Sequence, residues 1–212
     1  NVESEGAITV PAKAFADITR EWPETDLNIV VENEMLQLFG NLGDVEDGEG
    51  AYSLMGMPPD EFPDMESEIE GISVDFSSDS GTKATDLIDM IRKTLFAVSK
   101  DDTRPVLNGV FWNVNSTEME MIATDGSRLA CYRRKIDLDI PNKEETGVIV
   151  PPQTLTQVSK LLSGYEGSLL VTMGETQLLF KTENTILQSR LIEGPYVDYA
   201  QVLPKENNKS LS

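Results

Sequence analysis

The chain carries the same succession of hydrophobic patterns three times. Residues 8–11 (ITVP), 72–76 (ISVDF) and 148–151 (VIVP) each open one unit. In every unit a helical pattern follows, with apolar residues three and four positions apart, and then three short strand-like runs. The order β-α-β-β-β, starting near residues 7, 72 and 147, predicts an α+β fold of antiparallel meanders with one helix each.

The expected elements can be placed along each unit. Helices should follow the two Val-Pro pairs, where proline suits the first helical position, and a third should start near Thr82. Two such units make a domain of ordinary size. The expected strands that follow the helices are residues 27–31, 35–39, 51–55, 106–114, 119–124, 129–136, 168–172, 176–180 and 186–191.

Composition excludes several classes of protein. With 39% hydrophobic residues among 212, the chain can bury a core, yet no apolar run approaches the roughly 20 residues of a membrane-spanning helix. Cys131 is the single cysteine, so an internal disulfide or a zinc site is not expected, and a reducing cytoplasm is the natural compartment. The absence of histidine excludes His-based catalysis.

The net charge restricts how the protein could meet DNA. Seventeen basic residues against 37 acidic residues give −20. A chain of this charge does not hold DNA by neutralising phosphates over its whole surface. A nucleic-acid-binding role would need a locally basic face, or a way of staying on the nucleic acid that does not depend on binding affinity.

One turn is unusual for a plain sheet. Asp125-Gly126 lies between the strand-like runs 119–123 and 129–132, which predicts a hairpin, and Thr124 and Arg128 flank it. From the residues alone, the turn could be purely structural, with Asp-Gly satisfying the backbone geometry.

Four motifs give the chain a family resemblance. They are residues 107–109 (LNG), 123–130 (ATDGSRLA), 148–151 (VIVP), and 198–199 (DY) followed by 202–205 (VLPK). Their order and spacing, from about residue 6 to 209, resemble those of the bacterial sliding clamps, the beta subunits of DNA polymerase III.

The resemblance implies a DNA-clamp fold, with the helices on one face and the antiparallel sheets on the other. Clamps of this family have three domains of like fold and dimerise head to tail into a ring. The ring holds duplex DNA by topology and without sequence specificity, which would reconcile a charge of −20 with a DNA partner. The family's role is that of a non-catalytic processivity factor with no cofactor, metal or membrane. Its partners are replicative and repair DNA polymerases and the clamp loader.

The resemblance also implies a docking pocket for short peptide motifs of these partners. A glycine would let a peptide backbone approach closely, and apolar residues would form a shallow hydrophobic pocket. Arginine at the rim of the pocket would bind a carbonyl or an acidic residue of the peptide. The pocket residues of the family fall on Arg104, Leu107, Thr124, Gly126, Ser127, Arg128, Leu129, Val197 and Val202.

Three positions on the pocket rim depart from the family pattern. Ser127 stands where many relatives have histidine, Val197 where proline is common, and Gln201 where arginine is common. These changes could alter which partner motifs bind.

The basic residues of the helices are the candidates for facing DNA. In the first helix the numbers of basic and acidic residues are about equal. In the second helix the basic residues outnumber the acidic ones, and the third helix has a basic residue and no acidic one. The candidates are Lys13, Arg20, Lys83, Arg92, Lys93, Lys100 and Lys160. An ordinary solvated helix face of mixed charge is the alternative for each of them.

The unit boundaries predict three parts. We expect residues 1–68 to be the C-terminal half of a first clamp domain and 69–197 a complete middle domain. Residues 198–212 should connect to a third domain and begin it. The chain would thus be an internal part of a longer protein.

Two other functions stay open. An acidic adaptor of clamp-like fold could bind proteins without encircling DNA. A Mg²⁺-dependent enzyme could use carboxylates such as Asp101, Asp102, Asp137 and Asp139 or the cluster 44–49, although that cluster lacks the calcium-loop spacing.

Overall fold

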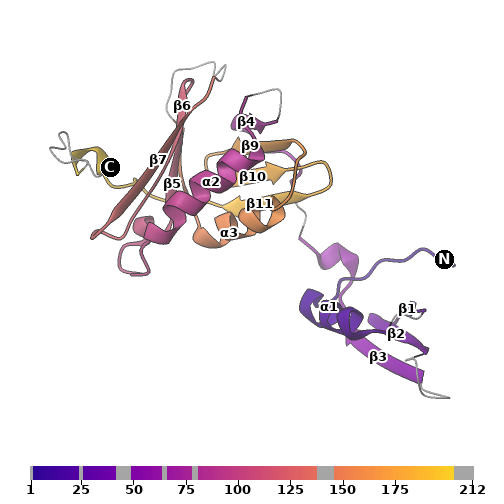
Figure 1. Ribbon diagram of the computed structural model, residues 1–212. Helices are drawn as coiled ribbons and strands as arrows, with labels where there is room; N and C mark the ends of the chain where they lie inside the picture. The colour runs from indigo at the N-terminus through magenta and orange to yellow at the C-terminus, as the bar shows by residue number, and fades with distance from the viewer. Residues whose placement is uncertain are drawn as a thin grey trace. The chain divides into compact units, whose positions relative to one another are not determined.

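The computed structural model describes residues 2–23, 26–41, 49–63, 66–77, 81–137 and 146–202 (Figure 1). The chain divides into two compact units, Asn1–Met65 and Glu66–Ser212. Residues 203–212 of the expected connection to a further domain at 198–212 lie outside the described residues, as do the acidic residues 44–48 and Asp139. Within the described ranges, no helix has the length and apolar character needed to span a bilayer.

The first unit contains one helix and a three-stranded antiparallel sheet. Its elements are α1 (Ala12–Glu21), β1 (Asn28–Glu32), β2 (Met35–Asn41), β3 (Glu49–Met55) and the 3-10 helix η1 (Pro59–Glu61), with sheet order β1-β2-β3. Asn33 and Glu34 join β1 to β2 with φ of 49° and 62°, the left-handed pair that a tight two-residue hairpin needs. Leu36 and Leu38 are the buried hydrophobic side chains of this unit's described part.

The second unit contains two repeats of the predicted pattern. The first repeat comprises β4 (Ile72–Phe76), α2 (Ala84–Thr94), the 3-10 helices η2 (Leu95–Ala97) and η3 (Pro105–Asn108), β5 (Val110–Val114), β6 (Glu118–Thr124) and β7 (Leu129–Lys135). The second comprises β8 (Thr146–Val150), α3 (Pro152–Leu161), β9 (Leu169–Met173), β10 (Gln177–Lys181) and β11 (Ile186–Arg190), and η4 (Tyr199–Gln201) follows it.

The two repeats exchange their first strands. The sheet orders are β11-β10-β9-β4 and β7-β6-β5-β8, so β4 of the first repeat pairs with β9 of the second, and β8 pairs with β5. The two pairings share one register, with Ile72 opposite Met173 and Thr146 opposite Val114. Each repeat thus contributes to both sheets, and the unit has an internal pseudo-twofold arrangement.

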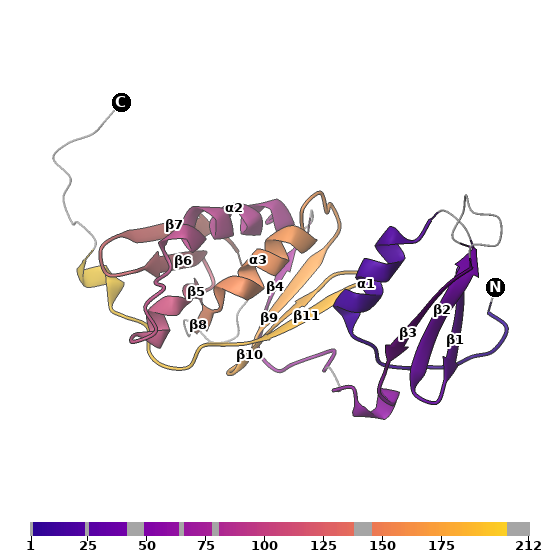
Figure 2. The same cartoon turned by 90° about the horizontal axis from the view of Figure 1, so that it is seen from below.

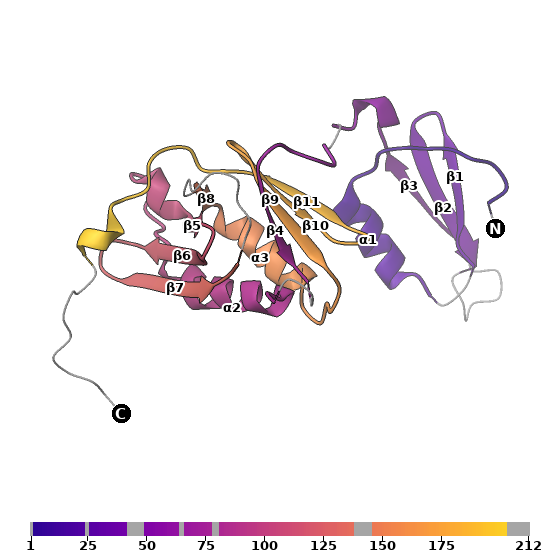
Figure 3. The ribbon, with the colours of Figure 1, turned by 90° about the horizontal axis from the view of Figure 1, so that it is seen from above.

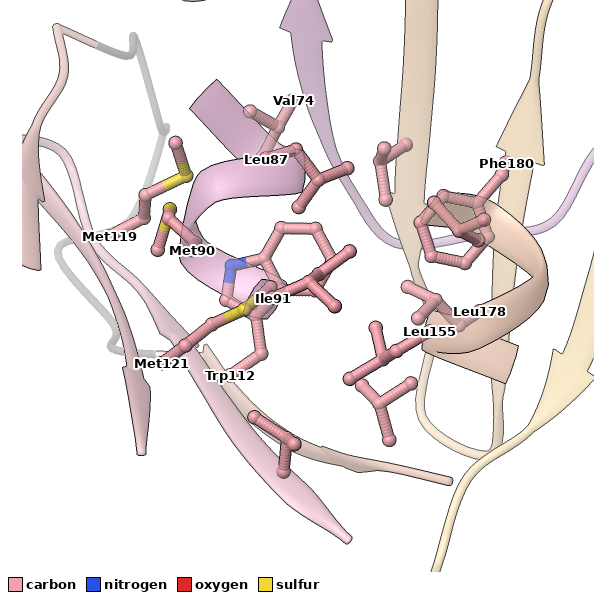
Figure 4. Close-up of a cluster of buried hydrophobic side chains, with 14 of the residues drawn as sticks. Val74, Leu87, Met90, Ile91, Trp112, Met119, Met121, Leu155, Leu178 and Phe180 are labelled. Atoms are coloured by element: carbon pink, nitrogen blue, oxygen red, sulfur yellow. The ribbon is translucent and has the colours of Figure 1, made fainter. Parts of the chain in front are cut away.

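One hydrophobic core joins the two sheets and the two helices. Trp112, Phe76 and Phe180 are fully buried in it, with ring centroids of Trp112 lying 6.4 Å from those of both phenylalanines. Figure 4 shows Leu87, Met90 and Ile91 of α2 and Leu155 of α3 pointing into the same space. Helices α2 and α3 lie side by side (Figures 1 and 2), as the α+β clamp fold predicts.

Two predicted strands differ from the structure. Residues 105–108 form η3, so β5 begins only at Val110. Pro105 lacks the N–H that a strand ladder requires, and the Leu107 N–H instead donates to the Arg104 carbonyl at 3.0 Å. Around residues 8–10, the pairing is reduced to a single bridge between Thr9 and Met57.

Candidate functional site

The turn between β6 and β7 is closed by its own side chains. Thr124 Oγ1 donates to the Arg128 carbonyl at 2.7 Å and accepts the Gly126 N–H at 3.1 Å. Asp125 Oδ1 accepts the backbone N–H groups of Ser127 and Arg128 at 2.9 and 3.1 Å. These backbone hydrogen bonds, together with the guanidinium of Arg128, hold the pKa of Asp125 below its usual value. Thr124 and Asp125 therefore shape the turn.

Arg128 ties this turn to the segment after α2. Its Nε donates to Asp125 Oδ2 at 3.0 Å, and its Nη2 donates to the Phe96 carbonyl at 2.8 Å. The guanidinium carbon also lies 5.7 Å from the centroid of the Phe96 ring, within the range of a cation–π contact. The guanidinium of Arg128 therefore links the hairpin to the segment that follows α2.

Arg104 lies against the same turn. Its Nη2 donates to the Asp125 carbonyl at 3.4 Å, and its Nη1 would lie 3.2 Å from a Cβ added at Gly126, where φ is +89°. The structure thus brings Arg104 together with residues 124–129. Two other predicted pocket residues, Leu107 and Thr124, are only 3% and 8% exposed, so they support the surface from beneath.

A groove of about 890 Å³ borders the turn. Asp125 and Arg128 line it, and so does Phe96, an aromatic side chain that is 60% exposed. Phe96 was not among the predicted site residues, although its place in η2, off the apolar stripe that runs through Leu87, Ile91 and Leu95, is the signal of an exposed aromatic residue. Lys100, predicted as a DNA-facing residue, lines this groove as well. The other lining residues are Leu95, Val98, Ser99, Asp102, Asn108, Pro151, Pro152, Gln153 and Ile192.

The segment after β11, residues 191–202, is termed the connector. It runs past β8 and β5 toward the end of the sheet where β6 and β7 meet (Figure 3). The Ile192 N–H donates to the Ile149 carbonyl at 2.9 Å, and the Tyr196 ring stacks on Phe111 with centroids 4.9 Å apart. Val197 lines a second groove, of about 550 Å³, between the connector and β5–β8, and does not line the groove at the turn.

A buried carboxylate fastens the connector to the sheet. Glu120 of β6 is 4% exposed. The Tyr199 hydroxyl donates to its Oε2 at 2.5 Å, and Arg133 Nε and the Cys131 thiol donate to its Oε1. None of the residues of this cluster was among the predicted site residues. The available signal was an acidic residue between Met119 and Met121 in an apolar strand.

The pKa values in this cluster follow from burial and hydrogen bonding. Burial raises the pKa of Glu120, but the hydrogen bonds from Tyr199, Arg133 and Cys131 outweigh it and hold the pKa below its usual value. Burial, and then the neighbouring carboxylate, raises the pKa of Cys131 to about 11 and that of Tyr199 well above its usual value. Glu120 is therefore ionised, while the thiol and the phenol keep their protons at neutral pH.

The predicted DNA-facing residues lie on helices or at their ends, except Lys100, which lies between η2 and η3. Arg20 of α1 pairs with Asp17 at 3.4 Å, and Arg92 of α2 pairs with Asp89 at 2.8 Å. Lys93 Nζ lies 4.3 Å from the centroid of the Tyr132 ring. The remaining candidates are exposed on or next to their helices: Lys13 on α1, Lys83 and Lys100 at either end of the α2 region, and Lys160 on α3.

The exposed faces of α2 and α3 carry few acidic groups. The exposed residues of α2 are Thr85, Arg92 and Lys93, and those of α3 are Gln153, Thr156, Gln157 and Lys160. The two acids of α2 are only partly exposed and each is paired, Asp86 with Arg134 at 2.8 Å and Asp89 with Arg92. This pair of helix faces is thus neutral to positive in a chain of net charge −20.

Asp101, one of the acidic residues considered for metal binding, has a local role. Asp101 Oδ1 accepts the N–H and the hydroxyl of Thr103 at 3.0 and 2.8 Å, which closes a turn and lowers the pKa of Asp101. In the part of the chain that the structure describes, no three His, Cys, Asp or Glu side chains are grouped to hold a metal ion.

Comparison with known proteins identifies related domains. The family model of the DNA polymerase III beta subunit N-terminal domain matches residues 1–66, and that of the central domain matches residues 82–198. The beta sliding clamp of Bacillus subtilis is 33% identical over 210 residues, which are 99% of this chain and 52% of that protein. The beta sliding clamp of Vibrio cholerae is 29% identical over 97% of this chain and 52% of that protein.

Solved structures agree with these sequence matches. The Bacillus subtilis DNA polymerase sliding clamp superposes with a TM-score of 0.79 at 31% identity, covering 97% of this chain and 50% of that one. The DNA polymerase III beta subunit of Pseudomonas aeruginosa gives a TM-score of 0.79 at 28% identity, covering 98% and 53%. The chain spans about half the length of the curated relatives it matches.

Proposed function

Because this chain belongs to the DNA polymerase III beta subunit family, we propose that its gene product is a sliding clamp. It would be a non-catalytic processivity factor of DNA replication in the cytoplasm. In the full-length protein, two subunits would form a ring around duplex DNA. The ring would be closed by the clamp loader and would bind replicative and repair polymerases.

The observation that carries this proposal is the pair of helix faces on α2 and α3. These neighbouring helices expose amide, hydroxyl and basic side chains, while their acids are paired. Such a surface can lie near phosphates without strong repulsion. It also lacks the dense positive charge that would bind DNA tightly and stop movement along it. A sliding device held by ring closure needs both properties.

A processivity assay tests the proposal on the full-length gene product. Combined with the organism's polymerase, clamp loader and ATP, it should lengthen the products of a single polymerase encounter with a primed circular template. Lys93→Glu together with Lys160→Glu should shorten these products by placing acids on the helix faces. Lys135→Glu, on the exposed end of β7, is the matched control and should leave the product length unchanged. If the length of the synthesised DNA is the same with and without the full-length protein, the proposal is contradicted.

We further propose that the surface formed by residues 104, 107, 124, 126–129, 197 and 202 docks extended peptides of the partner proteins. The rigid hairpin, with Gly126 and the rim residues Arg104 and Arg128, supports this assignment, and so do the exposed side chains of Val197 and Val202, at 40% and 69%. Phe96 adds an exposed aromatic contact at the same edge. Arginine and aromatic residues are the types that commonly dominate binding energy.

The docking surface can be tested at its exposed positions. Substitutions at the buried Leu107 and Thr124 would disturb the fold, so Val197→Asp is the more informative variant. Leu170→Asp is its control, because Leu170 is equally exposed at 40% but lies on β9. We expect Val197→Asp to weaken binding of a labelled peptide from the C-terminus of the organism's replicative polymerase, and Leu170→Asp to leave it unchanged. If the unmodified protein and both variants bind the peptide with equal affinity, Val197 is not part of the docking surface.

A further inference from the structure

We propose that Glu120 and Tyr199 are positioning residues that hold the connector in register with the hairpin for peptide docking. This inference rests on the proposed docking function. Neither residue was among the predicted pocket residues. Their role would be to fix the two valines of the connector relative to the hairpin at residues 124–129.

Tyr199 lies at the centre of the backbone that carries both valines. Its N–H donates to the Val197 carbonyl at 2.8 Å, and its own carbonyl accepts the Val202 N–H at 3.1 Å. The side chains of Val197 and Val202 are themselves 40% and 69% exposed. Their positions therefore depend on where Tyr199 is held.

Tyr199 is held by a buried carboxylate that has three hydrogen-bond partners. The Glu120 carboxylate accepts the Tyr199 hydroxyl at 2.5 Å and is almost fully buried on β6, an inner strand of the sheet β7-β6-β5-β8. Arg133, directly opposite Glu120 in the sheet register, binds the other carboxylate oxygen and compensates the charge. A hydrogen bond to an ionised acceptor is stronger than one between neutral groups.

Glu120 and the hairpin belong to the same strand. Thr124, the last residue of β6, follows Glu120 by four positions, which corresponds to roughly 13 Å of extended strand. The anchor and the hairpin are therefore separated by a length that the sheet itself fixes. An extended peptide of about four residues would bridge the same distance.

The upstream part of the connector has its own attachments. The Ile192 backbone and the stacked ring of Tyr196 contact the sheet independently of Glu120. The Tyr199 ring also lies 6.2 Å from the Phe111 ring, so loss of its hydrogen bond should loosen residues 197–202 without detaching them and leave residues 191–196 in place. This difference separates a positioning role from a general contribution to stability.

The test uses the full-length gene product with Tyr199→Phe, Glu120→Gln and both together. Tyr165→Phe is the matched control, because its hydroxyl donates one hydrogen bond to the Ser168 carbonyl at 3.1 Å, outside the site. The probe is a labelled peptide from the C-terminus of the organism's replicative polymerase. Affinity is measured alongside the melting temperature and amide hydrogen exchange.

We expect each single variant to bind the peptide about 5- to 10-fold more weakly, the usual net scale of one lost hydrogen bond. The double variant should bind no more weakly than the weaker-binding of the two single variants, since Tyr199→Phe removes, and Glu120→Gln weakens, the same hydrogen bond. Amide exchange should accelerate in residues 197–202 and stay unchanged in 191–196. Tyr165→Phe should bind as the unmodified protein does.

Two results would overturn the inference. Unchanged peptide affinity in all variants, with clear binding by the unmodified protein, would reject the positioning role and leave the docking function intact. Affinity losses that add in the double variant would show that Glu120 and Tyr199 act separately. Absence of peptide binding by the unmodified protein would instead reject the docking function itself, whatever the exchange data show.

Discussion

The Arg128 guanidinium and the Phe96 carbonyl, 32 residues apart in the chain, are joined by a hydrogen bond of 2.8 Å. The same guanidinium binds Asp125 at 3.0 Å, so one side chain connects the β6–β7 turn to the end of the α2 region. The arginine after the Asp-Gly turn is thus explained by structure before any ligand is considered. Its remaining N–H groups could still serve a bound peptide.

Replacing Arg128 by lysine should loosen this connection. A lysine ammonium cannot reproduce the planar fork that serves Asp125 and Phe96 together. We expect the free energy of unfolding to fall by about 1 kcal/mol, the usual net value of a lost hydrogen bond, measured by urea denaturation. Arg190→Lys, at an exposed position of β11, is the control and should leave the midpoint unchanged. The same loss in both variants would show that the connection adds no stability.

Replacing Gly126 by alanine should affect both stability and peptide binding. Its φ of +89° disfavours a side chain, and the new Cβ would lie 3.2 Å from Arg104 Nη1. Gly164→Ala is the control, because its φ is +76° and no atom lies within 4 Å of the added Cβ. Each variant should lose roughly 1 kcal/mol of stability through backbone strain. Weaker peptide binding is expected for Gly126→Ala alone, and equal binding by both variants would refute the role assigned to this glycine.

The two neighbouring leucines of β9 should differ sharply in their contribution to stability. Leu169 is fully buried between the sheets and helices, whereas Leu170 is 40% exposed on the other face. Leu169→Ala should cost about 2–5 kcal/mol of unfolding free energy through the lost contacts and the cavity left behind. Leu170→Ala should cost under about 1 kcal/mol. Similar losses would mean that the core is not where the structure has it.

The stability of the second unit should depend on the ionisation of Glu120. Its pKa is lowered in the folded state, so its stabilising contribution is complete above the unfolded value of about 4.5 and is lost as pH falls through the folded pKa. Tyr199 behaves oppositely: its raised pKa gives a contribution that is lost only at strongly alkaline pH. Glu120→Gln should therefore have a flatter acid limb in a plot of melting temperature against pH. An unchanged acid limb would contradict the assignment.

Local patterns were enough to predict most elements of the fold. The three strands after each helix, and the buried stripe of α2 with Leu87 and Ile91, follow from the spacing of apolar residues, and the α+β class was correct. The exchange of β4 and β8 between the two repeats could not be predicted in this way. Which strand lies beside β9 is decided by tertiary packing, and the patterns of β4 and β8 suit either sheet.

The candidate site was predictable only through family resemblance and local turn chemistry. The Asp-Gly hairpin was correct, but spacing does not reveal that Leu107 and Thr124 are buried or that Phe96 is exposed. The Glu120 cluster brings together β6, β7 and the connector, and Tyr199 is 79 residues away from Glu120. Contacts between residues so far apart in the chain form only when it folds, so the local pattern of apolar and polar residues does not predict them.

The central claim, that the gene product encircles DNA, is tested most directly by its retention on DNA of two topologies. The full-length protein, loaded by the clamp loader with ATP, is passed with nicked circular DNA through a gel-filtration column, and the DNA is then linearised with a restriction enzyme. We predict that the protein elutes with the circle and is lost from the linear molecule, because a closed ring can leave only over a free end. Equal retention on both forms, or on neither, would contradict the account.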